Sequence, residues 1–196
     1  MLLEVLNAIK DKLNNHIAPL VGKNPEQDKV VKLEDVARLA KGPEGSNDVE
    51  GEEANASIFI TLANIEEENA LKNNYPMKEQ GGVLIASKPV LFLNLYLLIA
   101  ANFNRYDEAL KHISFVLGFF QANKTMTVAL PNFPDPCTLT FNLHNISFEH
   151  LNNLWVVMGG QYRPSVLYKT KLLLVQESVE DGKYPILEIN SNETLS

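Results

Sequence analysis

Four histidines are the side chains of this sequence best suited to bind a metal ion or act as general bases: His16, His112, His144 and His150. A helical zinc site needs two histidines about one turn apart with a carboxylate beside them, because these groups must converge on one ion. No pair of the four has that spacing, and His144 and His150 flank a predicted helix start. We therefore expect all four at polar surface or interface positions.

Cys137 is the only cysteine of the chain, so neither an internal disulfide nor a thiolate metal cluster can form. A catalytic thiol needs a neighbouring base and a site that stabilises an anion. The residues around Cys137, between Pro136 and a predicted strand, indicate neither. We expect a structural, half-buried thiol in a protein that folds in a reducing cytoplasm.

The acidic run Glu66–Glu68 is the remaining candidate for chemistry, as a site for a hard cation. Such a site needs oxygen atoms that converge from several segments, whereas adjacent side chains point in different directions. A solvated face is the better interpretation. The chain also has no nucleophile elbow, phosphate loop or dinucleotide fingerprint. The sequence therefore predicts no enzyme activity, no resident cofactor and no metal site.

The formal net charge of −7 excludes two classes of partner. Surfaces that neutralise nucleic-acid phosphates or anionic lipids carry a surplus of Lys and Arg, so neither partner is expected. The first residues lack the basic region of a signal peptide. The longest apolar run, 90–101, is interrupted by Asn94 and is too short to span a bilayer.

Hydrophobic periodicity predicts a single α+β domain over residues 1–177 and a polar tail or arm at 178–196. The run 91–100 is apolar on both faces if extended, which is typical of a strand in the middle of a sheet. The expected fold is a mixed, mostly antiparallel sheet flanked by about three helices. The predicted segments are a helix at 2–17 ended by Pro19 and Gly22, strands at 30–33, 57–65, 91–100, 125–130, 138–144 and 165–175, an exposed acidic loop at 41–53, and an irregular stretch around 73–82.

Two further helices follow the central strand. Asn104 and Asp107 form a capping pattern for the first of them, with a predicted core stripe of Tyr106, Leu110, Ile113, Leu117 and Phe120. Phe115, Val116 and Phe119 widen this stripe, so the helix is expected to contact two partners, one of them another subunit. Ser147 is predicted to cap a short helix that ends at Gly159–Gly160 and buries Phe148, Leu151, Leu154, Trp155 and Met158.

Residues 139–171 join a strand, a capped helix with Trp155, a glycine turn, the motif Tyr162-x-Pro164 and a strand, in that order. This run resembles the N-terminal domain of tail-terminator proteins from extracellular contractile injection systems, of the antifeeding prophage and Photorhabdus virulence cassette type. Residues 95–103 and 106–121 and the opening helix are also similar to that family. Many members carry a longer C-terminal extension, and any function of that extension is expected to be absent here.

The resemblance implies a structural cap of a phage-tail-like particle. Such proteins form a hexameric ring that terminates the inner tube and anchors the top of the contractile sheath, without a cofactor. Assembly in the bacterial cytoplasm, into a particle that is released or anchored to the cell, is implied as well. A ring needs two different patches on each subunit. The tail segment 184–189 is a candidate arm, which Pro185 restricts to the edge of a sheet.

Interface residues are predicted from the broad helix and from the proline-bounded turn before the last strand. The candidates are Arg105, Phe115, Phe119, Tyr162, Arg163 and Pro164. Three alternatives to a cap stay open: a baseplate or adaptor component of the same particle, a small-ligand binding module and, third, an enzyme.

Overall fold

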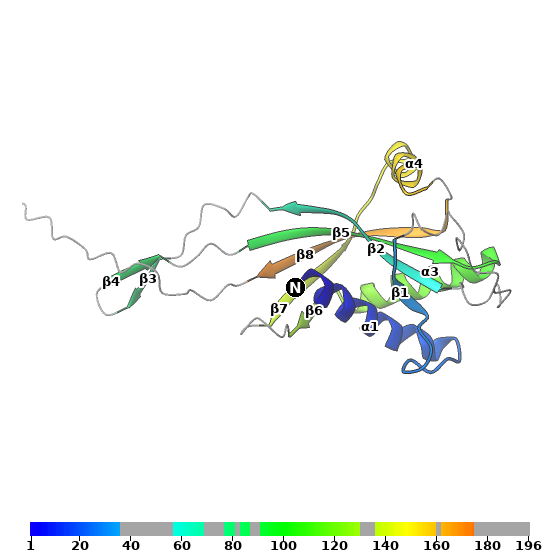
Figure 1. The fold of residues 1–196 in the computed structure, drawn as a ribbon, viewed down its shortest axis with the longest axis horizontal. Helices are drawn as coiled ribbons and strands as arrows, with labels where there is room; N and C mark the ends of the chain where they lie inside the picture. Colours follow the sequence, from blue (N-terminus) through cyan, green and yellow to red (C-terminus); the bar gives the residue numbers. More distant parts are fainter. Residues whose placement is uncertain are drawn as a thin grey trace, which may run out of the picture.

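A computed structural model of the chain describes residues 1–35, 57–68, 77–80, 83–86, 91–129, 136–159 and 162–174. Helices and strands alternate irregularly along the chain (Figure 1). Their bounds are α1 Leu2–Leu20, β1 Val31–Leu33, β2 Ser57–Glu67, β3 Met77–Gln80, β4 Val83–Ala86, β5 Leu91–Asn102, α3 Tyr106–Ala122, β6 Thr125–Val128, β7 Cys137–Leu143, α4 Phe148–Val157 and β8 Ser165–Leu174.

The main sheet has six strands in the order β1-β2-β5-β8-β7-β6. β1 runs parallel to β2, and every other neighbouring pair in this sheet is antiparallel. This mixed, mostly antiparallel sheet with helices around it confirms the predicted α+β fold. β3 and β4 form a separate antiparallel pair, in a segment that the sequence predicted to be irregular. The acidic loop at 41–53 and the tail at 178–196, with its segment 184–189, lie outside the described residues.

β5 occupies the middle of the sheet, as its apolar character on both faces predicted. Side chains alternate across a strand, and the odd-numbered Leu95, Leu97 and Ile99 pack into the larger core cluster. The even-numbered Leu98 and Ala100 pack into the smaller one. The strand therefore separates two hydrophobic layers.

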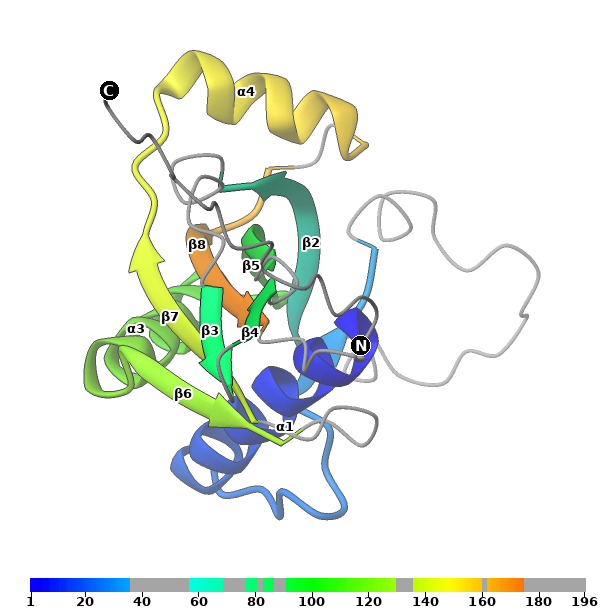
Figure 2. The same cartoon turned by 90° about the vertical axis from the view of Figure 1, so that its left-hand side faces the viewer.

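The helices divide between the two faces of the sheet (Figures 1 and 2). α1 and α3 cover one face, where side chains such as Ile9, Val116 and Phe120 share the larger cluster with residues from the strands. α4 covers part of the other face, where Trp155 packs with Phe59 of β2 and Leu167 of β8. Burying each large apolar side chain of these layers stabilises the fold by about 1.5–3 kcal/mol.

α1 is fixed to the sheet by a buried amide in addition to its predicted apolar stripe. The side chain of Asn14 is 2% exposed. Its Oδ1 accepts hydrogen bonds from the backbone N–H of Val30 at 2.9 Å and of Val31 at 3.1 Å. Its Nδ2 donates to the carbonyl oxygens of Pro25 at 3.1 Å and Asp28 at 3.3 Å. One side chain thus holds the connection to β1 and the start of that strand against the helix.

The predicted end of α1 needs a small correction. The helix continues through Pro19 to Leu20, and Gly22 follows with a φ of 73°. Glycine suits this left-handed conformation because it has no Cβ to clash with the backbone. The chain therefore turns at Gly22, as predicted, but the proline does not end the helix.

The predicted buried stripe of α3 is partly wrong. Tyr106 and Leu110 are 64% and 44% exposed. Ile113 and Phe120 are buried as predicted, and Leu117 is half-buried. The other side chains that this helix buries are Ala109, His112, Val116 and Phe119. The predicted capping pair does not form either, because the N-cap is Arg105 and makes no side-chain capping bond. The Asp107 carboxylate is bound to the Arg105 guanidinium instead.

The elements after α3 largely confirm their predictions. β6 and β7 form an antiparallel pair with alternating burial. Ser147 caps α4, since its hydroxyl oxygen accepts a hydrogen bond from the backbone N–H of His150 at 3.3 Å. Trp155 is buried as predicted, whereas Phe148 is 91% exposed, so its predicted place in the core is wrong. Gly159 ends the helical segment with a φ of 102°.

Candidate functional site

The four histidines occupy four separate environments. His16 packs against the ring of Phe119 with 5.3 Å between ring centroids, and His144 lies edge-on to Tyr96 at 5.1 Å. The Nδ1 atom of His150 lies 3.0 Å from the Ser147 hydroxyl. No group of three or more His, Cys, Asp or Glu side chains among the described residues could hold a metal ion.

His112 is the one histidine that is buried, which the sequence did not predict. Its ring stacks on Phe103 with 4.0 Å between centroids, and its Nδ1 lies 2.8 Å from the carbonyl oxygen of Glu108. Burial lowers the pKa of this imidazole, because the charged form loses its hydration. The backbone carbonyl and Glu108 oppose that shift. These contacts make His112 a packed residue of the α3 core.

Cys137 lies in the larger hydrophobic cluster at 3% exposure. Burial raises the pKa of its thiol, so the reactive thiolate is disfavoured. A structural thiol was predicted, and the structure buries it more completely than expected. Its burial therefore disfavours reaction as a nucleophile.

The acidic run at the end of β2 forms hydrogen bonds to its neighbours on the sheet. The Tyr96 hydroxyl donates to Glu66 Oε2 at 2.8 Å, and this hydrogen bond is the largest cause that raises the pKa of Tyr96. Asn94 Nδ2 donates to Glu68 Oε2 at 3.2 Å, and Lys171 Nζ lies 3.9 Å from the same oxygen. The carboxylates therefore interact with separate partners on a largely exposed face.

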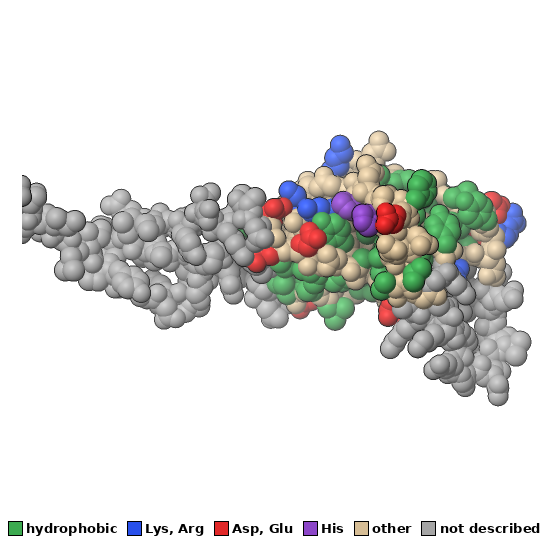
Figure 3. All heavy atoms as spheres, turned by 90° about the horizontal axis from the view of Figure 1, so that it is seen from above, with side chains coloured by type: hydrophobic (Ala, Val, Ile, Leu, Met, Phe, Trp, Pro, Cys, Tyr) green, Lys and Arg blue, Asp and Glu red, His purple; other side chains and the backbone are tan. Residues whose placement is uncertain are grey.

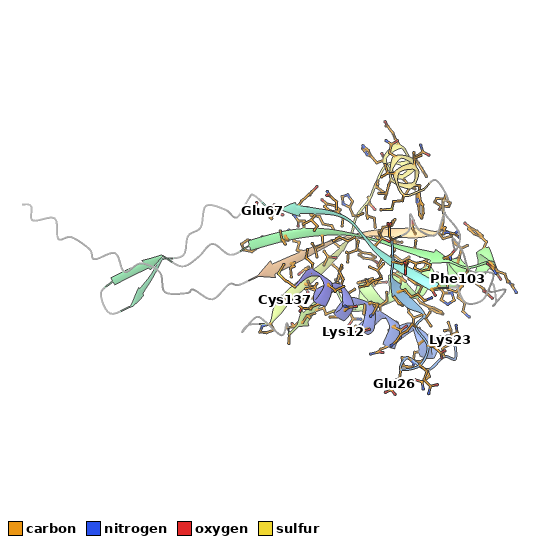
Figure 4. All side chains as sticks on the ribbon, in the orientation of Figure 1. Lys12, Lys23, Glu26, Glu67, Phe103 and Cys137 are labelled. Carbon is orange, nitrogen blue, oxygen red and sulfur yellow. The ribbon has the colours of Figure 1, made fainter. Side chains whose placement is uncertain are left out.

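A hollow of about 370 Å³ lies between the end of α1 and the start of α3. Val21, Val30 and Phe103 provide its apolar lining, and Lys23, Glu108, Lys111 and His112 complete it. Lys23 and Phe103 lie at the same end of the molecule (Figure 4). Two other hollows on the described surface have volumes of about 230 Å³ each. Pockets for drug-sized ligands usually measure about 300–1,000 Å³ and enclose most of the ligand. The hollow of about 370 Å³ lies at the low end of this range, and the other two lie below it.

α4 carries the two most exposed large apolar side chains of the described residues, Phe148 and Val157, and Val156 beside them. Phe148, Val157 and Val156 are 91%, 82% and 63% exposed. Hydrophobic side chains gather on this side of the molecule (Figure 3). Large exposed apolar side chains that cluster on one element typically mark a protein–protein contact.

A second exposed apolar area lies on α3. Tyr106 and Leu110 are one helical turn apart, so they lie on the same side of the helix. Arg105 and Asp107, at 70% and 66% exposure, form an ion pair beside them. The Arg105 guanidinium lowers the pKa of Asp107 through this hydrogen-bonded contact.

The predicted interface residues differ in how much surface they present. Arg105 and Tyr162 are well exposed, and the Tyr162 ring lies edge-on to Trp155 at 5.8 Å. Phe115 is half-buried, with Lys111 Nζ 5.8 Å from its ring centroid. Phe119 is 5% exposed and belongs to the core.

Arg163 and Pro164 are the remaining predicted interface residues. Both are half-buried, and the Pro164 carbonyl accepts a hydrogen bond from the Ala101 N–H at 2.9 Å. The turn that they form is thereby tied to the end of β5. Of the six candidates, Arg105 and Tyr162 therefore offer the most accessible side chains.

No helix among the described segments is long and apolar enough to cross a membrane. Comparison with curated proteins finds no match. Among solved structures, the chain is similar to the sheath/tube terminator of PVC, an extracellular contractile injection system, in its extended state. The TM-score is 0.58 at 17% identity, and the match covers 100% of this chain and 64% of that one. That likeness confirms the fold.

The tube-terminating cap of the anti-feeding prophage also matches, with a TM-score of 0.45 at 18% identity, over 73% of this chain and 50% of that one. The chain thus spans 64% and 50% of the lengths of these two proteins. The model of one protein family, the Pvc16 N-terminal domain, matches residues 4–188. Since that match covers nearly the whole sequence, the chain belongs to the Pvc16 N-terminal domain family.

Proposed function

We propose that this protein is a structural cap subunit of a phage-tail-like contractile injection particle. It forms a hexameric ring on the last ring of the inner tube, stops tube growth and anchors the top of the sheath. It assembles in the bacterial cytoplasm and becomes part of a particle that is released or anchored to the cell. The match of residues 4–188 to the Pvc16 N-terminal domain family carries this proposal.

Two features of the molecule support a structural role. The described residues bring together no metal-binding cluster, and the one thiol is buried. Exposed apolar side chains lie instead on α3 and α4, where they can meet other proteins. These exposed side chains support a role in which the protein acts by binding other proteins.

The proposed role is tested by deleting the gene from a cluster that encodes the particle. Electron microscopy is expected to show tubes of irregular length and unstable sheaths, and the wild-type gene supplied in trans is expected to restore uniform particles. A Phe119→Ser variant, which places a hydroxyl in the core, serves as a folding-defective control. Uniform, stable particles in the deletion strain would contradict the cap role.

Two alternatives have separate tests. A baseplate or adaptor component would be found by gold labelling at the baseplate end of the particle, whereas a cap lies at the opposite end. A small-ligand module would use the hollow beside His112, where Lys23 and Lys111 could attract an anion. Thermal-shift measurements against a panel of anionic metabolites test that alternative, with Lys111→Ala as the matched variant.

A further inference from the structure

The hollow between the end of α1 and the start of α3 combines buried and exposed groups around one space. Val30 and His112 are 3% and 7% exposed and form its inner part. Lys23, Glu108 and Lys111 also line it, and all three are exposed. Its volume of about 370 Å³ is that of a site for a small molecule. We call this space the His112 hollow.

The ring of His112 offers a hydrogen-bond acceptor to this hollow. Its Nδ1 lies 2.8 Å from the carbonyl oxygen of Glu108, so Nδ1 carries the proton and donates to that carbonyl. Burial, and to a smaller extent Lys111 and Lys23, lower the pKa of His112, so the neutral ring is favoured and Nε2 is an acceptor. Within the described residues no group donates to Nε2, and this atom is not one of the enclosed polar atoms without a partner. A ligand N–H can therefore reach Nε2 and satisfy it.

Charges of both signs surround the same hollow without pairing to each other. Among the described residues, the ammonium groups of Lys23 and Lys111 form no ion pair with Glu108 or with another carboxylate. The neighbouring guanidinium of Arg105 is bound to Asp107. Two cations and one anion are thus available to a ligand that carries both signs of charge.

The apolar lining of the hollow consists of Val21, Val30 and Phe103. A simple inorganic anion would contact the lysines alone and leave this lining uncovered. A fatty acid would cover the lining but bring no donor for Nε2 of His112. An apolar α-amino acid carries a carboxylate, an ammonium group with three donors and an apolar side chain on one carbon atom, so it has a partner for each kind of group in the hollow.

We infer that the His112 hollow binds an apolar α-amino acid in its zwitterionic form. Lys23 and Lys111 attract the carboxylate. Nε2 of His112 and the carboxylate of Glu108 accept hydrogen bonds from the ammonium group, and the side chain packs against Phe103. The inference does not depend on the cap role, because the hollow is separate from the exposed apolar side chains of α4.

Titration with L-leucine, followed by NMR of the isotope-labelled full chain, tests the site. A small ligand at a partly exposed hollow is expected to bind with a Kd of about 0.1–3 mM. The amide signals of Val21, Val30 and Phe103 and the ring signals of His112 are expected to shift together. Glycine lacks the apolar side chain and is expected to bind at least about tenfold more weakly. Absence of shifts at these residues with about 30 mM leucine overturns the inference.

Two analogues of leucine test the zwitterion on the wild-type chain. Leucine amide lacks the carboxylate, and N-acetyl-leucine lacks the ammonium group. Each is expected to bind about tenfold more weakly than leucine, or less tightly still. N-acetyl-leucine also has the chemistry of a protein C-terminus, and leucine amide that of a protein N-terminus. An analogue that binds as tightly as leucine therefore overturns the inference and identifies a chain terminus as the ligand.

K23M/K111M removes both cations and keeps most of the two side-chain stems. This variant is expected to bind leucine about tenfold more weakly or worse, with an unchanged melting temperature because both lysines are exposed. K124M is the matched control, since Lys124 is an exposed lysine that follows the far end of α3 and does not line the hollow. Wild-type affinity of K23M/K111M for leucine overturns the inference.

H112F keeps a ring against Phe103 and removes Nε2. Leucine is expected to bind this variant about tenfold more weakly. Acetylation of the ammonium group should then weaken binding less than it does in wild type, because one acceptor of that group is already absent. An equal effect of acetylation in both proteins overturns the contact with Nε2. Circular dichroism and the melting temperature check the fold of H112F, and the comparison of analogues on the wild-type chain stands if that variant is unstable.

Discussion

Replacing Asn14 by alanine is expected to be among the more damaging single changes to this subunit, although it removes no apolar side chain. The substitution leaves the N–H groups of Val30 and Val31 buried without an acceptor. Each buried unsatisfied donor costs about 1–3 kcal/mol. The carbonyls released at the other end of the amide are partly exposed and can bind water. Alanine regains about 0.6 kcal/mol of helix propensity. Two such donors cost about 2–6 kcal/mol, so the net loss of stability is about 1.4–5.4 kcal/mol after the gain in propensity.

Urea unfolding followed by circular dichroism measures this loss, at one protein concentration for all variants. For a chain of this size the melting temperature should fall by about 2–4 °C per kcal/mol, which gives about 3–20 °C. Asn15 is the matched control, since it is the next residue of the same helix and is exposed. N15A is expected to be neutral or slightly stabilising. The carboxylate of N14D can accept both N–H bonds but cannot donate, so its stability should fall between those of wild type and N14A.

Amide hydrogen exchange locates the defect. The carbonyl of Val30 accepts a hydrogen bond from the N–H of Ile58 at 2.8 Å, so Val30 connects the helix to the sheet. N14A is expected to speed exchange at Val30 and Val31 more than at the centre of β5. A free energy of unfolding within 0.5 kcal/mol of wild type, or unchanged exchange at these two amides, would refute the reasoning.

Three further changes have definite expected results. S147A removes the cap of α4 and should cost about 1 kcal/mol, measured by urea unfolding, whereas S114A, on the exposed side of α3, should be neutral. Cys137 should react with a thiol reagent only as fast as the chain opens, so its rate should rise with denaturant. Burial holds the pKa of His112 in the folded state below the ordinary value of about 6.5, so the unfolded chain binds more protons and stability should fall as the pH drops below that value. H112Q should flatten that part of the pH–stability curve, and an unchanged slope would contradict the assignment.

The sequence predicted those segments well in which the pattern of hydrophobic residues fits only one type of element. The β5 run is apolar on one face and, apart from Asn94, mostly apolar on the other, and a strand that buries both faces lies in the middle of a sheet. Ser147 precedes a short amphipathic segment, and its hydroxyl caps that helix as its position predicted. In both cases the local pattern and the tertiary environment favour the same conformation.

The buried face of α3 was not predictable with the same certainty, because the helix is apolar on several sides. Two apolar stripes are possible on this helix, one through Tyr106 and Leu110 and one through Ala109 and Val116. Their directions around the helix axis differ by only a fraction of a turn. The stacking of His112 on Phe103 and the burial of Ala109 against the sheet favour the second phase. Asn14 gave no signal either, since an amide within a helix is more often exposed, and only the chain that folds beside it provides its partners.

Phe119 and Phe148 show why an interface is harder to predict from sequence than a core. Sequence patterns placed Phe148 inside and Phe119 among the surface candidates, and the structure places them at 91% and 5% exposure. Both rings belong to amphipathic helices, so hydrophobicity does not distinguish a ring that packs on the sheet from one that faces outward. The difference depends on where each residue lies along its helix, since Phe148 is the first residue of α4 and Trp155, seven residues on, packs with Leu167. An exposed Phe148 that the fold does not need is therefore the residue whose substitution should affect assembly without affecting stability.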